Sequence, residues 1–187
     1  MSKITNTLGQ LIEWFDRHHA PMHQDGGVDE ISITELAGTK VCTFHVNAFQ
    51  YYAPGTDWSP LWYGALLGAN KSNKSLYLPL NFLKVGDIIT NYTVGIRLNV
   101  VAGDTVTADC ALIRVNTGDS PTKTSVTNGA ITQLTADGFT QAAANNDDEA
   151  VATGKQYALE ITGTTSNVST AESVICFGAE VTITRIM

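Results

Sequence analysis

The sequence predicts an all-β protein: an antiparallel β-sandwich or jelly roll that follows a short N-terminal helix and a connector. From Val41 onward, apolar residues recur at every second position in many short runs, as in strands with one buried face. Clusters of Gly, Asp, Asn and Pro separate these runs. Only 16% of the 187 residues are charged, and Thr, Asn, Ser and Gly take their place, which favours strands and turns over helices. We therefore expect residues 1–40 to hold the helix and connector, and residues 41–187 to form the sandwich.

Residues 5–17 predict an amphipathic helix, because their apolar side chains recur with the spacing of one helical face. Pro21 ends the helix. A helix of about 12 residues is marginal alone in water, so its apolar residues need a partner, either the body of the chain or sister helices in an oligomer. These residues are Leu8, Leu11, Ile12, Trp14 and Phe15.

Residues 18–31 carry unusual chemistry for a connector, with three histidines, two adjacent glycines and three acids. The segment is a linker, a metal site, or a piece that orders against other chains. On a helix, His19 and His23 would face one ion, but Pro21 between them disfavours a metal held within one chain. A site on a symmetry axis, with one histidine from each of three chains, stays open. We favour a connector shared among chains, without a cofactor. The residues expected to take part are His19, His23, Gly26, Gly27 and Asp29.

The body is expected to consist of strands separated by turns. In the last run, Ile175, Phe177, Ala179, Val181 and Ile183 alternate with smaller or polar residues, which predicts that they share one buried face. The polar stretch 141–154 predicts an exposed loop. The runs that predict strands are 41–49, 62–67, 76–82, 93–101, 106–115, 157–162 and 175–184. The predicted turns are 85–87, 102–104, 117–121, 136–138 and 163–165.

An irregular stretch at residues 51–63 is rich in aromatic residues and proline. Its rings suit either a sugar-stacking platform, because flat rings with polar tips match sugar faces, or the core or a subunit interface. We favour the interface and keep the platform as the alternative. The residues concerned are Tyr51, Tyr52, Trp58, Trp62 and Tyr63.

Catalysis is not expected. His45 is the only histidine of the body and lies in an apolar run, which favours a core or face-lining role. Cys42 lies three residues away, so the two side chains would face opposite sides of a strand and form no dyad. The sequence has no common nucleophile, phosphate-loop, zinc-protease or dinucleotide motif. With Cys110 and Cys176, Cys42 is expected to be a buried free thiol.

Charge and hydropathy exclude other classes of partner. The net charge is −7 and the basic residues are scattered, which argues against nucleic-acid binding. No apolar run approaches the roughly 18–20 residues that span a bilayer. The first residues lack the order of a signal peptide, so we expect synthesis in a cytoplasm.

Residues 19–31, His-Ala-Pro-Met-His-Gln-Asp-Gly-Gly-Val-Asp-Glu-Ile, followed by Leu36-Ala37-Gly38, resemble a connector of tailed-bacteriophage structural proteins. In that family the segment occurs in tail fibres, head fibres and other appendages, usually ahead of a trimeric domain. Here it lies near the N-terminus with no long shaft after it, which implies a short attachment: a head fibre, a capsid decoration protein or a tail-tip protein.

We therefore expect a virion structural protein, made in the host cytoplasm, that acts by assembly. The expected partners are two further copies of the chain in a homotrimer and other virion proteins of the capsid, portal or tail. The alternative function is a receptor-recognition (adhesin) module that binds a host surface glycan. The position of the aromatic residues distinguishes the two, because a glycan platform needs exposed rings.

Overall fold

A computed structural model describes residues 39–47, 53, 55–117, 122–165 and 171–186. Lys40–Ile186 form one compact unit. The predicted helix, the connector with His19 and His23, and both Tyr51 and Tyr52 lie outside the described residues, so these predictions stay predictions. In the described part of the chain, no helix is long and apolar enough to cross a membrane.

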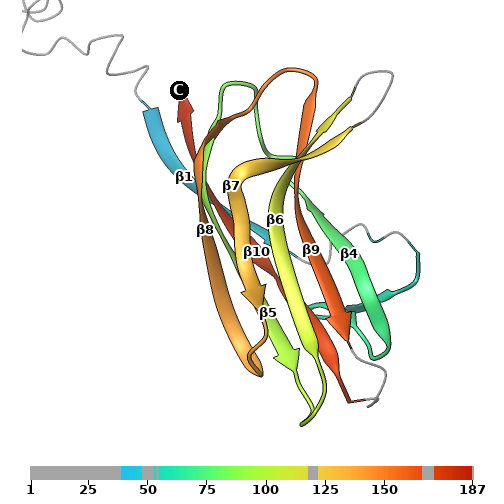
Figure 1. Cartoon of the computed structure of the whole chain (residues 1–187). Coiled ribbons are helices and arrows are strands. Elements are labelled where there is room, and N and C mark those ends of the chain that lie inside the picture. The colour runs from blue at the N-terminus through green and yellow to red at the C-terminus, as the bar shows by residue number, and fades with distance from the viewer. Residues whose placement is uncertain (1–38, 48–52, 54, 118–121, 166–170, 187) are drawn as a thin grey trace, which may run out of the picture. The chain divides into compact units, whose positions relative to one another are not determined.

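Two β-sheets pack face to face (Figure 1). Sheet A has the order β2-β3-β10-β5-β8, with β1 also paired to β10, and sheet B has the order β4-β9-β6-β7. The pairs among β2–β10 are antiparallel, which confirms the predicted β-sandwich. The strands are β1 (Thr39–Asn47), β2 (Trp58–Leu61), β3 (Gly64–Leu67), β4 (Lys71–Pro79), β5 (Ile88–Asn99), β6 (Val106–Asn116), β7 (Lys123–Leu134), β8 (Gly138–Ala150), β9 (Lys155–Thr165) and β10 (Ser173–Ile186).

The strand order is that of a jelly roll. Each strand from β3 to β6 lies beside a partner from the second half of the chain, in the pairs β3–β10, β4–β9, β5–β8 and β6–β7. The chain therefore folds as one long hairpin that is wrapped into two sheets. This wrapping puts β10 in the middle of sheet A, where its outer face forms the floor of the site described below.

Alternating apolar residues fill the space between the sheets. On β5, Val94, Ile96 and Leu98 are buried while Arg97 between them is exposed, as the sequence predicts. Sheet B faces them with its own fully buried leucines and isoleucines. These include Leu76, Leu78, Leu112, Leu159 and Ile161.

The predicted loop at 141–154 is wrong over most of its length, because β8 runs to Ala150. Ala142 and Ala144 are buried beside β5, while Gln141 and Ala143 on the other face are exposed. Because the two inward residues are small alanines among polar neighbours, the alternation of apolar and polar residues is too weak to predict a strand. The strand β7, equally polar in composition, was not predicted either.

Two further boundaries differ from the prediction. The predicted turn at 163–165 is the end of β9, and Gly163 is there for space: a Cβ would lie 2.6 Å from Leu67 Cδ2. The predicted strand at 62–67 begins only at Gly64, because Trp62 and Tyr63 form the tight turn between β2 and β3.

A β-bulge at Phe177 reverses the predicted faces in the first part of β10. The register against β5 shifts between Cys176 and Gly178, so Phe177 is an extra residue. Val174 and Cys176 belong to the core before the bulge, and Ala179, Val181 and Ile183 after it. The prediction that Phe177 shares the buried face of Val181 is therefore wrong. The bulge leaves the phenyl ring on the outer face of sheet A.

Candidate functional site

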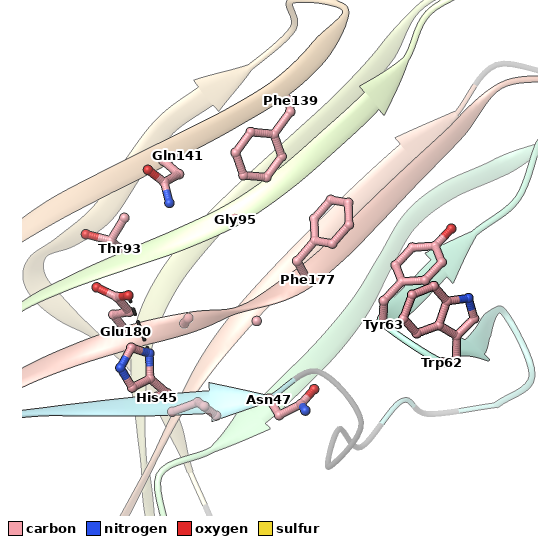
Figure 2. Close-up of a pocket in the computed structure, with 13 residues that line it drawn as sticks. His45, Asn47, Trp62, Tyr63, Thr93, Gly95, Phe139, Gln141, Phe177 and Glu180 are labelled. Carbon is pink, nitrogen blue, oxygen red and sulfur yellow. Dashed lines mark ion pairs between the residues drawn. The ribbon is translucent and has the colours of Figure 1, made fainter.

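An open groove of about 450 Å³ lies on the outer face of sheet A (Figure 2). Strands β1, β10, β5 and β8 and the β2–β3 turn all contribute side chains to it. We call it the sheet A groove. Aromatic rings occupy one end and polar side chains gather at the other.

Four aromatic rings form a contiguous strip, the aromatic strip, made of Trp62, Tyr63, Phe177 and Phe139. The ring centroids are 4.8 Å apart for Trp62 and Tyr63, 5.7 Å for Tyr63 and Phe177, and 5.5 Å for Phe177 and Phe139. Trp62 is 83% exposed and Phe139 is 58% exposed. Contiguous exposed rings make this strip a candidate for a binding site, whereas exposed apolar residues that occur singly are common on protein surfaces.

Glycines allow the strip to assemble. Gly64 follows the β2–β3 turn, and a Cβ there would overlap the carbonyl oxygen of Cys176 on β10. The turn can therefore carry Trp62 and Tyr63 alongside Phe177 only because residue 64 has no side chain. On β5, a Cβ at Gly95 would touch both Phe139 and Phe177, so the glycine leaves the floor between these two rings low.

The polar side chains of the groove come from four strands and include His45 on β1, Glu180 on β10, Thr93 on β5 and Gln141 on β8 (Figure 2). His45 Nδ1 lies 3.4 Å from Glu180 Oε1, and both side chains are more than half exposed. In the described part of the chain, the side chains of Thr93 and Gln141 make no hydrogen bond, and neither do His45 Nε2 and Glu180 Oε2. These donors and acceptors are therefore available to a ligand.

The structure divides the aromatic residues that the sequence singled out. Trp62 and Tyr63 belong to the groove, whereas Trp58 is buried in the core at 4% exposure. Its Nε1 donates to the carbonyl oxygen of Lys74 at 3.2 Å, and its ring lies against Gly163. Trp58 therefore cannot serve as an exposed platform ring.

Sequence reasoning missed the other half of the site. Phe139 lies between the predicted turn at 136–138 and the predicted loop at 141–154, and the sequence pattern places Phe177 in the core. No sequence motif singles out Thr93, Gln141 or Glu180 as a site residue. His45 lines the outer face of the sheet, which is one of the two roles expected for it. Cys42 packs against the core on the opposite side of the same strand, as the spacing of three residues predicts.

The three cysteines lie outside the groove. Cys110 and Cys176 are buried free thiols, as expected, whereas Cys42 is only partly buried. Burial raises the pKa of the Cys176 thiol to about 12 and also raises the pKa of Cys110, so both stay protonated and unreactive at neutral pH. Among the described residues, no group of three His, Cys, Asp or Glu side chains is placed to hold a metal ion.

No family model and no curated protein matches the chain. Several solved structures are similar in backbone. One comprises the CBM22-1 and GH10 modules of a Clostridium thermocellum xylanase, at 18% identity and a TM-score of 0.48, covering 78% of this chain and 28% of that one. Another is the CBM36-1 domain of a xylanase from a Trinervitermes trinervoides hindgut metagenome, at 8% identity and a TM-score of 0.47, covering 75% of this chain and 96% of that one. A third is a family 29 carbohydrate-binding module from Piromyces equi, at 10% identity and a TM-score of 0.44, covering 76% and 90%. Similarity at this level says nothing about the ligand of this chain.

Proposed function

We propose that the sheet A groove binds a glycan. The observation that carries this proposal is the continuity of the aromatic strip with polar side chains that keep hydrogen-bonding atoms without a partner among the described residues. A sugar ring has an apolar C–H face and an edge of hydroxyl groups. Aromatic rings suit the first, and carboxylate, amide, hydroxyl and imidazole groups suit the second.

The placement of these residues supports binding without a large ordering cost. Thr93, Phe139, Gln141, Phe177 and Glu180 all project from strands of a tightly packed sandwich. Because the backbone beneath them is fixed, less conformational freedom is lost on binding.

The groove suits binding better than hydrolysis. Glycoside hydrolysis generally uses two carboxyl groups on either side of the bond that is cleaved. Among the described residues that line the groove, Glu180 is the one with a carboxyl group. The proposed role is therefore recognition, which corresponds to the receptor-binding alternative of the sequence interpretation.

A glycan panel followed by calorimetry tests the proposal. The wild-type protein should bind at least one immobilised glycan, and Phe139→Ala and Phe177→Ala should each weaken that binding about tenfold, or about 1.4 kcal/mol. Val85→Ala is the matched control, because Val85 is 67% exposed but lies outside the groove. Binding that is unchanged in both phenylalanine variants, or the failure of every glycan to bind, would exclude the proposal.

A second proposal concerns assembly, and its support is the sequence of residues 19–31. We propose that this segment attaches the protein as a trimer to a phage particle. Light scattering of the full-length protein should give the mass of three chains. The mass of a single chain at micromolar concentration would contradict the trimer.

A further inference from the structure

We infer that the sheet A groove takes an uncharged glycan, and that Glu180 is the residue that disfavours uronic acids and sialic acids. This inference rests on the proposed glycan-binding function. It concerns the polar end of the groove, where charge decides which sugars fit.

The polar end has a negative charge without a neighbouring cation of fixed charge. Among the described residues that line the groove there is no lysine or arginine, and Glu180 is the single acid. His45 contacts only one oxygen of its carboxylate, at 3.4 Å. The second oxygen, Oε2, has no donor in the part of the chain that the structure describes.

Arg97 is the cation to consider, because it also lies on the outer face of β5 and pairs with Phe139. Its Nε donates to Asn99 Oδ1 at 3.1 Å, further along the same strand. Glu180 is opposite Thr93, whereas Arg97 is opposite Ile175, so the strand register separates the arginine from the acid. Arg97 therefore does not neutralise the polar end.

A neutral sugar and an acidic sugar would meet different interactions at Glu180. A carboxylate can accept hydrogen bonds from two adjacent hydroxyl groups, and charge-assisted bonds of this kind are strong. A ligand carboxylate in the same place would face a like charge, in an environment where unit charges repel more than in bulk water. The groove should therefore prefer neutral chains.

The experiment compares acidic polysaccharides with their own carboxyl-reduced forms, which keep the linkages and lose only the charge. Polygalacturonate, alginate and hyaluronate serve as the acidic probes, and xylan and cellohexaose as further neutral probes. Full-length wild-type protein should bind at least one uncharged probe, and should bind a carboxyl-reduced chain about tenfold more tightly than its acidic parent. Higher salt should narrow this difference, because it screens the repulsion.

Glu180→Gln should reduce the preference to about twofold or less, with little change in folding because the side chain is 55% exposed. Asp109→Asn is the matched control. It changes the net charge equally but lies on β6 of the other sheet, so the preference should persist in it. The control separates the effect of Glu180 from the repulsion of polyanions by a protein of net charge −7.

The outcomes distinguish this inference from the proposed function. A wild-type protein that prefers the acidic parents, with binding lost in Arg97→Gln, would overturn the inference and leave glycan binding in place. A preference that survives unchanged in Glu180→Gln would also overturn it. If no probe of either charge binds, the proposed function itself fails.

Discussion

Trp58 and Trp62 are four residues apart, and replacing each by alanine should have opposite consequences. Trp62 is 83% exposed in the aromatic strip, whereas Trp58 is 4% exposed in the core. Trp62→Ala should therefore weaken glycan binding and leave folding nearly unchanged. Trp58→Ala should lower the free energy of unfolding and affect binding only through the loss of folded protein.

The sizes of both effects follow from the buried areas. Stacking on one face of an indole ring covers on the order of 100 Å², worth about 2.5 kcal/mol at about 25 cal/mol per Å². Ordering of the ligand offsets part of this, so Trp62→Ala should cost 1–2 kcal/mol of binding, roughly 5- to 30-fold in Kd. Trp58→Ala leaves a cavity beside Gly163 and should cost about 3–5 kcal/mol of stability.

Calorimetry with a bound glycan of the panel measures the loss of binding in Trp62→Ala, and urea unfolding followed by circular dichroism measures the loss of stability in Trp58→Ala. Both variants are compared with wild-type protein under the same conditions. The assignment of the groove would be refuted by a Trp62→Ala variant that binds as tightly as wild type. A Trp58→Ala variant with wild-type stability would refute the described packing of the core.

Three further predictions concern the framework. Gly64→Ala should cost roughly 1–3 kcal/mol of stability, because the added Cβ overlaps the β10 backbone. It should also weaken glycan binding, because the β2–β3 turn must shift. An unchanged melting temperature and unchanged binding would contradict this prediction. Arg185 donates to both carboxylate oxygens of Asp87, at 2.8 and 2.6 Å, and holds the pKa of that acid below its usual value. The resulting stability is present above about pH 4 and is lost as pH falls through the lowered pKa, so the advantage of wild type over Asp87→Asn in urea unfolding should shrink with acid. Tyr92→Phe should cost about 1–2 kcal/mol, because the buried hydroxyl donates to Gly129 O at 2.7 Å; a loss below about 0.5 kcal/mol would be inconsistent with that bond.

The sandwich was predictable where strands bury large side chains. On β5, β6 and β9, valine, leucine and isoleucine alternate with polar residues, and this period places each inner face correctly. On β8 the inner residues include Ala142 and Ala144, which bury little area. Hydrogen bonding to β5 makes this segment a strand, and pairing between distant segments leaves no local signal.

The groove was predictable only in part, for the same reason. Trp62 and Tyr63 were visible as an aromatic cluster, but the sequence does not show that Phe139 and Phe177 lie beside them. Their juxtaposition depends on the jelly-roll order, which puts β10 between β3 and β5 and puts β8 next to β5. Without this long-range order, the sequence does not show that Trp62 and Tyr63 lie in the groove while Trp58 is buried.

The β-bulge at Phe177, which makes the predicted faces of β10 wrong, also supplies the central ring of the aromatic strip. With regular alternation from Val181 back along the strand, the Phe177 ring would enter the core and Gly178 would take the outer position. The aromatic strip would then lose its central ring, and Tyr63 would be separated from Phe139, since Phe177 contacts both. One extra residue keeps Val174 and Cys176 buried while it turns the phenyl ring outward. The departure from regular alternation therefore lies at the surface that we propose as the glycan-binding site.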